Sequence, residues 1–242
     1  MKAAIIIPAR FASTRLPGKP LADLCGKPLI QHVVERASGA KKAMKVIVAT
    51  DDDRIAAAVR GFGGEVAMTR ADHRSGSERA AEVAATIDAD IIVNLQGDEP
   101  EIDPEHIDYL IGIQADHGAF ATTLACKFPS NIDVADRSAV KAIPGDPLSG
   151  GIWTAKYFTR GAPSTTDFNV APYFLHVGIY AFSRSSLQKF ASAPEGALEK
   201  SESLEQLRIL EMGEKIVLGE VDAAVPGIDT PADLEAARAR NC

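Results

Sequence analysis

A short cationic loop follows the first apolar run of the chain. Residues 3–7 are long enough for one buried strand, which we expect to end at Pro8, and Arg10, Arg15 and Lys19 come soon afterwards. In parallel α/β sheets, ligands bind outside the carboxyl ends of the strands. The planar fork of Arg and the point charge of Lys both suit phosphate. The loop therefore predicts a cradle for a polyphosphate, and a solvated basic turn is the alternative.

Two aspartates could complete such a site by holding a metal ion. Asp98 follows the apolar run 90–95, and the glycine before it, Gly97, lets a ligand approach the backbone closely. Asp229 also follows an apolar stretch and precedes a helical pattern. Mg²⁺ takes one or two carboxylates together with phosphate oxygens and water. We therefore predict Asp98 and Asp229 as magnesium ligands, against the alternatives of a turn residue and of part of a helix cap.

Apolar runs and segments of helical period alternate along the chain, and these elements must position the candidate side chains. Strands are expected at 3–7, 45–50, 65–68, 90–95, 121–126, 176–182 and 216–221. Helices are expected at 28–37, 54–62, 77–86, 104–115, 184–191, 199–212 and 231–240. The alternation predicts an α/β fold of the three-layer sandwich type, with helices on both faces of a mostly parallel central sheet, in a single domain of residues 1–242.

Residues 130–175 depart from this rhythm. Two short strand patterns flank the turn-rich segment 144–151, which is typical of a hairpin. We therefore expect a small antiparallel excursion from the main sheet. The regular pattern returns afterwards, and the last helix opens with Thr230, Pro231 and Asp233, a cap, a first-turn proline and an acidic residue at the helix N-terminus.

Composition excludes several classes of partner and location. The formal net charge of −7 argues against general attraction to nucleic acid or to an anionic membrane surface, whereas a local basic loop suits a small anionic ligand. No apolar run approaches the roughly 18 residues of a membrane span, and the N-terminus shows no secretory leader pattern. Three widely spaced cysteines, Cys25, Cys126 and Cys242, predict reduced thiols without a disulfide or zinc site. We expect a cytoplasmic protein without membrane insertion.

Two common nucleotide-binding motifs are absent from the sequence, and only one histidine has an unusual position. Neither the G-x-x-x-x-G-K-[ST] loop of Walker-type nucleotidases nor the G-x-G-x-x-G dinucleotide fingerprint occurs. Four of the five histidines are interpreted as surface or helix-face residues. His176 differs because it opens an expected strand and shares one face of it with Tyr180. These two side chains could line a pocket, and a satisfied core histidine is an equally good interpretation.

Seven segments carry a family resemblance across nearly the whole chain. In order, they are PARFASTRLPGKPL, ATDDDRI, HRSGSERAAE, NLQGDEP, HVGIYAF, SLEQLRILE and GIDTPADLE. The first alone resembles only the wider sugar nucleotidyltransferase group. Together the seven segments resemble the 3-deoxy-manno-octulosonate cytidylyltransferases, or CMP-Kdo synthetases, of lipopolysaccharide biosynthesis. The resemblance implies a nucleotide-diphospho-sugar transferase-like fold and a reaction in which Kdo attacks CTP, giving CMP-Kdo and pyrophosphate with Mg²⁺ as cofactor.

The resemblance also implies roles for individual residues. The catalytic residues would be Arg10, Arg15, Lys19 and Asp98. The nucleotide-binding residues would be Arg10, Ser13, Arg15, Lys19, Ser75, Arg79 and Gln96. The sugar-binding residues would be Gln96, His176, Tyr180, Glu205 and Gln206, of which the last two are expected on a helix. Asp98 and Asp229 would hold Mg²⁺, which can lower the pKa of the attacking hydroxyl.

Two departures from the family pattern leave alternatives open. Ser77-Glu78 replaces the usual Thr-Asp or Thr-Glu, and no second arginine follows Arg160 in the segment 161–167. The cationic partner of the sugar carboxylate is therefore missing or replaced. Alternatives are a cytidylyltransferase for a related acidic sugar, such as 8-amino-Kdo or a sialic acid, and a nucleotide-binding homologue without catalysis. The resemblance further implies a homodimer with residues 130–175 at its interface.

Overall fold

The computed structural model describes the chain of 242 residues except for residues 14, 131, 163–171 and 224–226. The strands are β1 Ala3–Ala9, β2 Asp23–Leu24, β3 Lys27–Pro28, β4 Ala43–Thr50, β5 Glu65–Met68, β6 Ile91–Leu95, β7 Ala121–Cys126, β8 Lys141–Ser149, β9 Ile152–Thr159, β10 Phe174–Ser183 and β11 Ile216–Val221. The helices are η1 Lys19–Leu21, α1 Leu29–Ala37, α2 Asp53–Gly61, α3 Gly76–Ala84, α4 Pro104–His117, α5 Arg184–Ser192, α6 Ala197–Glu202, α7 Leu207–Glu211 and α8 Pro231–Asn241.

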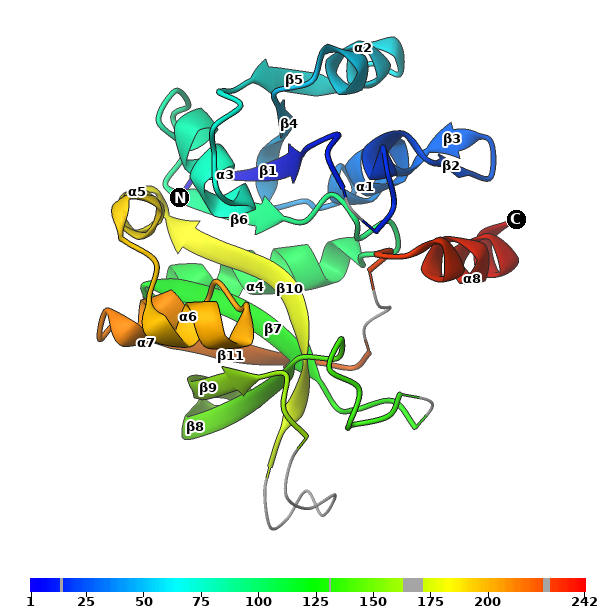
Figure 1. Cartoon of the computed structure of the whole chain (residues 1–242). Helices are drawn as coiled ribbons and strands as arrows, with labels where there is room; N and C mark the ends of the chain where they lie inside the picture. The colour runs from blue at the N-terminus through cyan, green and yellow to red at the C-terminus, as the bar shows by residue number, and fades with distance from the viewer. Residues whose placement is uncertain (14, 131, 163–171, 224–226) are drawn as a thin grey trace.

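Nine strands form one sheet in the order β5-β4-β1-β6-β10-β7-β11-β9-β8 (Figure 1). The strands β5, β4, β1 and β6 are parallel, β10 runs antiparallel to β6 and β7, and β11 is parallel to β7. The parallel part places the ends of β1 and β6 next to each other, which brings the cationic loop and Asp98 to one edge. The predicted α/β fold class is confirmed.

Helices cover both faces of the sheet because successive residues of its central strand β1 are all apolar and point to opposite faces. Ile5 and Ile7 of β1 pack in a core with residues of α1, α2 and α4, whereas Ala4 and Ile6 pack in a second core with residues of α3, α5 and α7. All four are fully buried, and burial of each isoleucine side chain contributes about 1.5–3 kcal/mol. The strand therefore holds the start of the cationic loop rigidly.

The expected antiparallel hairpin at residues 141–159 is present and belongs to the main sheet. Its strand β9 pairs with β11, and β8 pairs with the start of β10. The turn is shorter than expected, because β8 continues through Pro144 and Pro147 with shifts in register and the chain reverses at Gly150 and Gly151. Proline lacks a ladder donor, so these shifts are where it can be accommodated.

Two other predicted boundaries are wrong. The strand β1 does not end at Pro8 but continues to Ala9. Its pairing with β6 ends at Ile6, so the missing N–H of Pro8 removes no hydrogen bond to β6. The helix expected at 199–212 is broken into α6 and α7, because Ser203 takes a left-handed conformation with φ of 53°. Serine competes with the helix backbone and favours such ends.

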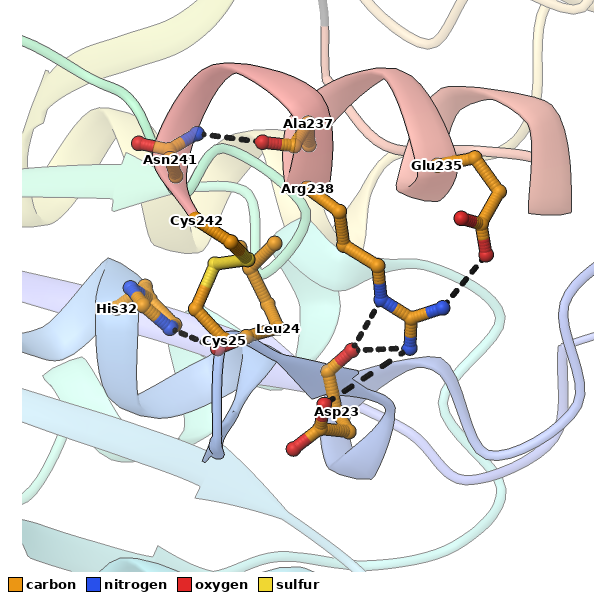
Figure 2. Close-up of a disulfide and its surroundings, with 9 residues drawn as sticks. All are labelled: Asp23, Leu24, Cys25, His32, Glu235, Ala237, Arg238, Asn241 and Cys242. Atoms are coloured by element: carbon orange, nitrogen blue, oxygen red, sulfur yellow. Dashed lines mark hydrogen bonds and ion pairs between the residues drawn. A yellow bond between two sulfur atoms is a disulfide. The ribbon is translucent and has the colours of Figure 1, made fainter.

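The prediction of three reduced cysteines without a disulfide is wrong for two of them. Cys25, in the β2–β3 hairpin, and Cys242, at the end of α8, form a disulfide with a Cα–Cα distance of 5.4 Å (Figure 2). Their separation of 217 residues conceals the pairing in the sequence. Beside the disulfide, the Arg238 guanidinium donates to the carbonyl oxygen of Asp23 at 2.6 and 3.2 Å. These links attach α8 to the hairpin.

A small third core lies under α8. Its buried members are Leu24, Leu29, Ile228, Leu234 and Ala237. The helix begins at the predicted cap, where the Thr230 hydroxyl accepts from the Asp233 amide and the Asp233 carboxylate accepts from the amides of Thr230 and Asp229. The anchored helix therefore fixes the position of Asp229. Among the described helices, none is long and apolar enough to cross a membrane.

Candidate active site

The loop after β1 is folded back on an aromatic side chain. The Gly18 amide donates to the Phe11 carbonyl, and the Phe11 ring lies so close to Gly18 that a Cβ there would stand 3.1 Å from it. Gly18 also has a φ of 66°, which favours glycine. On the Phe11 ring lies the guanidinium of Arg54, 3.3 Å from the ring centroid. This packing fixes the loop that leads to Lys19, the first residue of η1.

Lys19 joins the two predicted metal ligands. Its Nζ donates to Asp98 Oδ2 at 2.7 Å and to Asp229 Oδ1 at 2.8 Å. The Arg15 guanidinium lies 3.0 Å from the same Asp229 oxygen. Three segments far apart in sequence, the loops after β1 and β6 and the turn before α8, thus converge on one point. The side chains of Lys19 and Asp98 are only 15% and 27% exposed, whereas Arg15 is 61% exposed and can turn toward a ligand.

The charges of this cluster shift the pKa values of two of its side chains. Burial opposes the positive charge of Lys19, but the carboxylates of Asp98 and Asp229 outweigh burial and raise the pKa of its ammonium. Burial, followed by repulsion from Asp98 and Asp229, raises the pKa of the neighbouring Glu99 to about 8. Glu99 is thus mostly protonated at neutral pH and adds little negative charge. Sequence reasoning missed this residue, although a second acid beside Asp98 was a visible signal.

The carboxylate pair fits a magnesium ion that also binds a phosphate. Asp98 and Asp229 both accept a hydrogen bond from the Lys19 ammonium, so their carboxylates face the same position and can bind one cation together. In the part of the chain that the structure describes, no group of three or more carboxylate, imidazole or thiolate side chains is arranged so that it could hold a metal ion. Mg²⁺ dehydrates reluctantly and is commonly held by one or two carboxylates plus substrate phosphates. The donor set therefore suits a metal that arrives with a nucleotide.

A second group of polar side chains lies buried between β6, α3 and the α6–α7 break. The Asn94 amide donates to Ser77 Oγ at 3.1 Å, and Ser77 Oγ donates to Glu205 Oε2 at 3.0 Å. Burial raises the pKa of Glu205, against the opposing hydrogen bonds from Ser75 and Ser77. Glu205 does not lie on a helix as expected, but in the turn between α6 and α7. Asn94 was missed, although a lone amide within an apolar run signals a functional position.

We call this cluster of polar side chains the polar pocket and define it as Asn94, Ser77, His176, Tyr180, Glu205 and Gln206. Among the described residues, three of its atoms have no hydrogen-bond partner. They are Asn94 Oδ1, Glu205 Oε1 and Gln206 Nε2, and each has almost no exposed surface. Such atoms are costly when unpaired, and they usually mark a site of function or bound water. Two acceptors and one donor match the hydroxyl groups of a polyol.

His176 and Tyr180 come from the irregular part of β10. Tyr180 lies opposite Asn94 in the sheet, and its ring centroid is 5.5 Å from that of His176. The Thr123 hydroxyl donates to the carbonyl of Ile179 at 2.7 Å, so the His176 Nε2 at 2.9 Å must be the donor to Thr123. Burial lowers the pKa of His176 to about 3. The imidazole is therefore neutral, and its Nδ1 is left as an acceptor.

The other residues that were predicted to bind the nucleotide lie in different surroundings. Arg10 is exposed at the end of β1, and Gln96 lies at the end of β6 beside Gly76. Ser13 and Ser75 accept bonds from the Leu16 and Glu78 amides at 3.4 and 3.2 Å, so both hydroxyls shape their own turns. Their roles in nucleotide binding remain predictions.

Arg79 stands apart from these residues because it is buried. Its guanidinium lies 3.0 Å from Asp51 and bonds to Thr69 and to the Arg70 carbonyl. These are the contacts of a structural residue that holds the loop before α3. A role in nucleotide binding stays a prediction, and the contacts give it no support.

Arg160 was singled out because no second arginine follows it. Its guanidinium donates to the carbonyls of Arg137 and Glu202, both at 3.0 Å, and to that of Ser203 at 3.4 Å. It therefore stabilises the α6–α7 break that carries Glu205. The segment expected to hold a second arginine falls mainly in 163–171, outside the described residues.

The sequence of this chain is similar to those of known proteins. The family profile described as Cytidylyltransferase matches residues 4–216. A 3-deoxy-manno-octulosonate cytidylyltransferase of Rhodopseudomonas palustris (strain BisA53) is 48% identical over 238 residues, covering 97% of this chain and 94% of the relative. One of Escherichia coli is 46% identical over 239 residues, covering 98% and 95%.

Solved structures agree as well. A CMP:2-keto-3-deoxy-manno-octonic acid synthetase in complex with CTP superposes with a TM-score of 0.90 at 45% identity, covering 99% of this chain and 98% of that one. An apo UDP-glucose pyrophosphorylase, with a TM-score of 0.73 at 15% identity and coverage of 99% and 98%, shares the fold alone. With matches of this identity over nearly its full length, the chain belongs to the 3-deoxy-manno-octulosonate cytidylyltransferase family.

Proposed function

We propose that the protein transfers cytidine monophosphate from CTP to 3-deoxy-manno-octulosonate, releasing pyrophosphate, as a step of lipopolysaccharide biosynthesis. The observation that carries the proposal is the convergence of Arg15, Lys19, Asp98 and Asp229 at the end of β1 and β6. Strand β6, which ends shortly before Asp98, also carries Asn94 of the polar pocket, whose buried atoms without hydrogen bonds suit a polyol. A charged cluster for a triphosphate and a polar pocket for a polyol suit this pair of substrates, and the close relatives carry the corresponding name.

The reaction requires one substitution at phosphorus. A bond forms between the anomeric oxygen of the sugar and the α-phosphorus of CTP, and the bond from that phosphorus to the bridging oxygen of the β-phosphate breaks. The bonding electrons leave with pyrophosphate, and the hydroxyl proton passes to solvent. Such transfers depend on positioning and neutralisation of charge more than on a covalent nucleophile. Arg10, Arg15 and Lys19 are proposed to hold the phosphates in line.

The polar pocket is proposed to orient the sugar. His176 is too weak a base to keep a proton at neutral pH, since its pKa is about 3. Its neutral Nδ1 instead accepts a bond from a sugar hydroxyl, and Glu205 and Gln206 bind further hydroxyls. We propose that the reaction depends on Mg²⁺, held by Asp98 and Asp229. When bound, this ion would supply charge neutralisation and would lower the pKa of the attacking hydroxyl.

A pyrophosphate-release assay tests the proposed function. The protein is incubated with CTP and Mg²⁺ and with Kdo, 8-amino-Kdo or a sialic acid, and a parallel series contains EDTA in place of metal. We expect release with CTP and Kdo only when Mg²⁺ is present. Turnover with another sugar but not with Kdo would reject the proposed substrate, and no release with any sugar would reject the activity. Undiminished release in EDTA would reject the magnesium requirement.

We also propose a cytoplasmic homodimer. The support is the family resemblance and the hairpin of β8 and β9, which extends from the far end of the sheet (Figure 1). Light scattering at micromolar concentration would show twice the mass of 25.6 kDa for the chain. A mass equal to that of one chain would reject the dimer.

A further inference from the structure

One ammonium group links the two carboxylates that are proposed to bind metal. Lys19 Nζ lies 2.7 Å from Asp98 Oδ2 and 2.8 Å from Asp229 Oδ1, and its side chain is only 15% exposed. The Arg15 guanidinium adds a second positive group 3.0 Å from the same oxygen of Asp229. The negative charges of Asp98 and Asp229 are thus balanced by two positive ones in this structure.

A divalent cation cannot simply join this arrangement. Whichever carboxylate oxygens it used, a metal ion held by both Asp98 and Asp229 would stand a few ångströms from the Lys19 ammonium, which contacts one oxygen of each. Like charges at such a distance repel strongly when they are partly buried. Metal binding to both carboxylates is therefore opposed as long as the Lys19 ammonium stays in place.

We propose that Lys19 occupies the place of the metal ion in the free protein and thereby sets the order of binding. This inference rests on the proposed function. The ammonium leaves the carboxylates when a triphosphate offers it a new anionic partner, and only then do Asp98 and Asp229 bind a divalent cation together. The same lysine thus excludes metal before the nucleotide arrives and neutralises phosphate charge afterwards.

The local structure allows this exchange. Lys19 opens η1, and its Cα is held by backbone bonds of the loop, including one from the Lys19 amide to the Leu16 carbonyl at 3.1 Å. The ammonium is borne on a flexible four-carbon stem, so it can move between two anionic partners while the backbone stays in place. Because nucleotide removes the competitor of the metal, the two ligands must promote each other's binding to the same extent.

Manganese binding by the nucleotide-free protein tests the proposal. Unbound Mn²⁺ is measured by electron paramagnetic resonance during titration of the parent and of Lys19→Met, which keeps the stem and removes the charge. We expect Lys19→Met to bind Mn²⁺ at least about tenfold more tightly than the parent, a typical coupling for linked sites. Lys19→Arg keeps a cation and should bind as weakly as the parent. An unchanged or weaker affinity in Lys19→Met would overturn the proposal.

Two controls make this result specific. Lys27→Met removes an exposed lysine that pairs with Glu35 at 2.8 Å, and it should leave the manganese affinity of the parent unchanged. Adding Asp98→Asn to Lys19→Met should abolish the gain, because the metal then loses one of its two carboxylates. A gain that persists in this double variant, or that appears in Lys27→Met, would show a general charge effect and overturn the proposal.

Thermal melting gives a second readout that does not depend on activity, and it also shows whether each variant is folded. Lys19→Met leaves two carboxylates without their cation, so Mn²⁺ should raise its melting temperature more than that of the parent. An equal rise in both proteins would count against the proposal. The pyrophosphate assay separates the two failures: turnover in the parent with an unchanged manganese affinity in Lys19→Met rejects only the lysine exchange, whereas absence of turnover rejects the proposed function.

Discussion

The two ends of the candidate site satisfy their polar atoms in opposite ways. At the charged end, Lys19 contacts both Asp98 and Asp229 at normal hydrogen-bond distances. In the polar pocket, one atom each of Asn94, Glu205 and Gln206 is buried without a hydrogen-bond partner among the residues that the structure describes. A buried charge costs far more than a buried neutral dipole. The charged end therefore balances its carboxylates within the protein, whereas the polar pocket leaves hydrogen-bonding atoms that a bound molecule would satisfy.

The largest expected effect is at the charged end. Asp98→Asn keeps the size of the side chain but removes the charge that metal and Lys19 share. We expect turnover to fall by about a thousandfold, since one preorganised electrostatic group commonly contributes 10²–10³. Pyrophosphate release at limiting Mg²⁺ measures the effect, and circular dichroism shows that the fold is kept. Asp116→Asn, an exposed site on α4, serves as a control with parental activity. Equal activity in Asp98→Asn and the parent would refute the proposed metal ligand.

The anchoring of α8 is the next largest contribution. Cys242→Ser removes the disulfide to Cys25, which closes a loop of more than 200 residues. We expect the free energy of unfolding to fall by about 2–4 kcal/mol, as is typical of natural disulfides. Urea denaturation measures it, and a reducing agent should bring the parent down to the variant without changing the variant itself. If the reductant changes neither protein and both are equally stable, the disulfide does not anchor α8.

The disulfide also shows what the sequence could not reveal. Strands at 65–68, 121–126 and 216–221 were predicted with the bounds that the structure has, because each is an uninterrupted pattern of local preferences. The contact of Cys25 with Cys242 depends instead on how α8 packs on the β2–β3 hairpin. The convergence of Lys19, Asp98 and Asp229 was predictable because all three lie next to expected strand or helix ends.

The polar pocket was only partly predictable, for a physical reason. Asn94 lies within an apolar run and is buried because of its neighbours on β10 and α3, which local sequence does not specify. Glu205 was expected on a helix because 199–212 has helical periodicity. The left-handed Ser203 and the carbonyl contacts of Arg160 break that helix, and both are consequences of tertiary structure.

His176→Phe should have a smaller effect than Asp98→Asn and should be confined to the sugar. Phenylalanine keeps the ring contacts with Tyr180 and removes the Nδ1 acceptor. We expect kcat/KM for Kdo to fall by about 10–100-fold, as for loss of one hydrogen bond to a buried polar group. The affinity for CTP, measured by calorimetry, should stay the same, and His117→Phe on the surface is the control. Equal losses for both substrates would place His176 outside the sugar pocket.

The smallest expected effect concerns the stability of the pocket at different pH. Burial raises the pKa of Glu205 above its usual 4.5, so between 4.5 and the higher folded value the native protein binds more protons than the unfolded chain. The free energy of unfolding contributed by this group then falls as pH rises through that window. Glu205→Gln removes the penalty of an ionised buried carboxylate, so above the window it should be more stable than the parent by about 1 kcal/mol. Urea denaturation at several pH values tests this, with the exposed Glu195→Gln as a control. Should Glu205→Gln destabilise the protein at pH 8, the ionised carboxylate must be held firmly by its hydroxyl partners and by the Arg208 guanidinium 3.9 Å away, and the pocket would resemble the charged end.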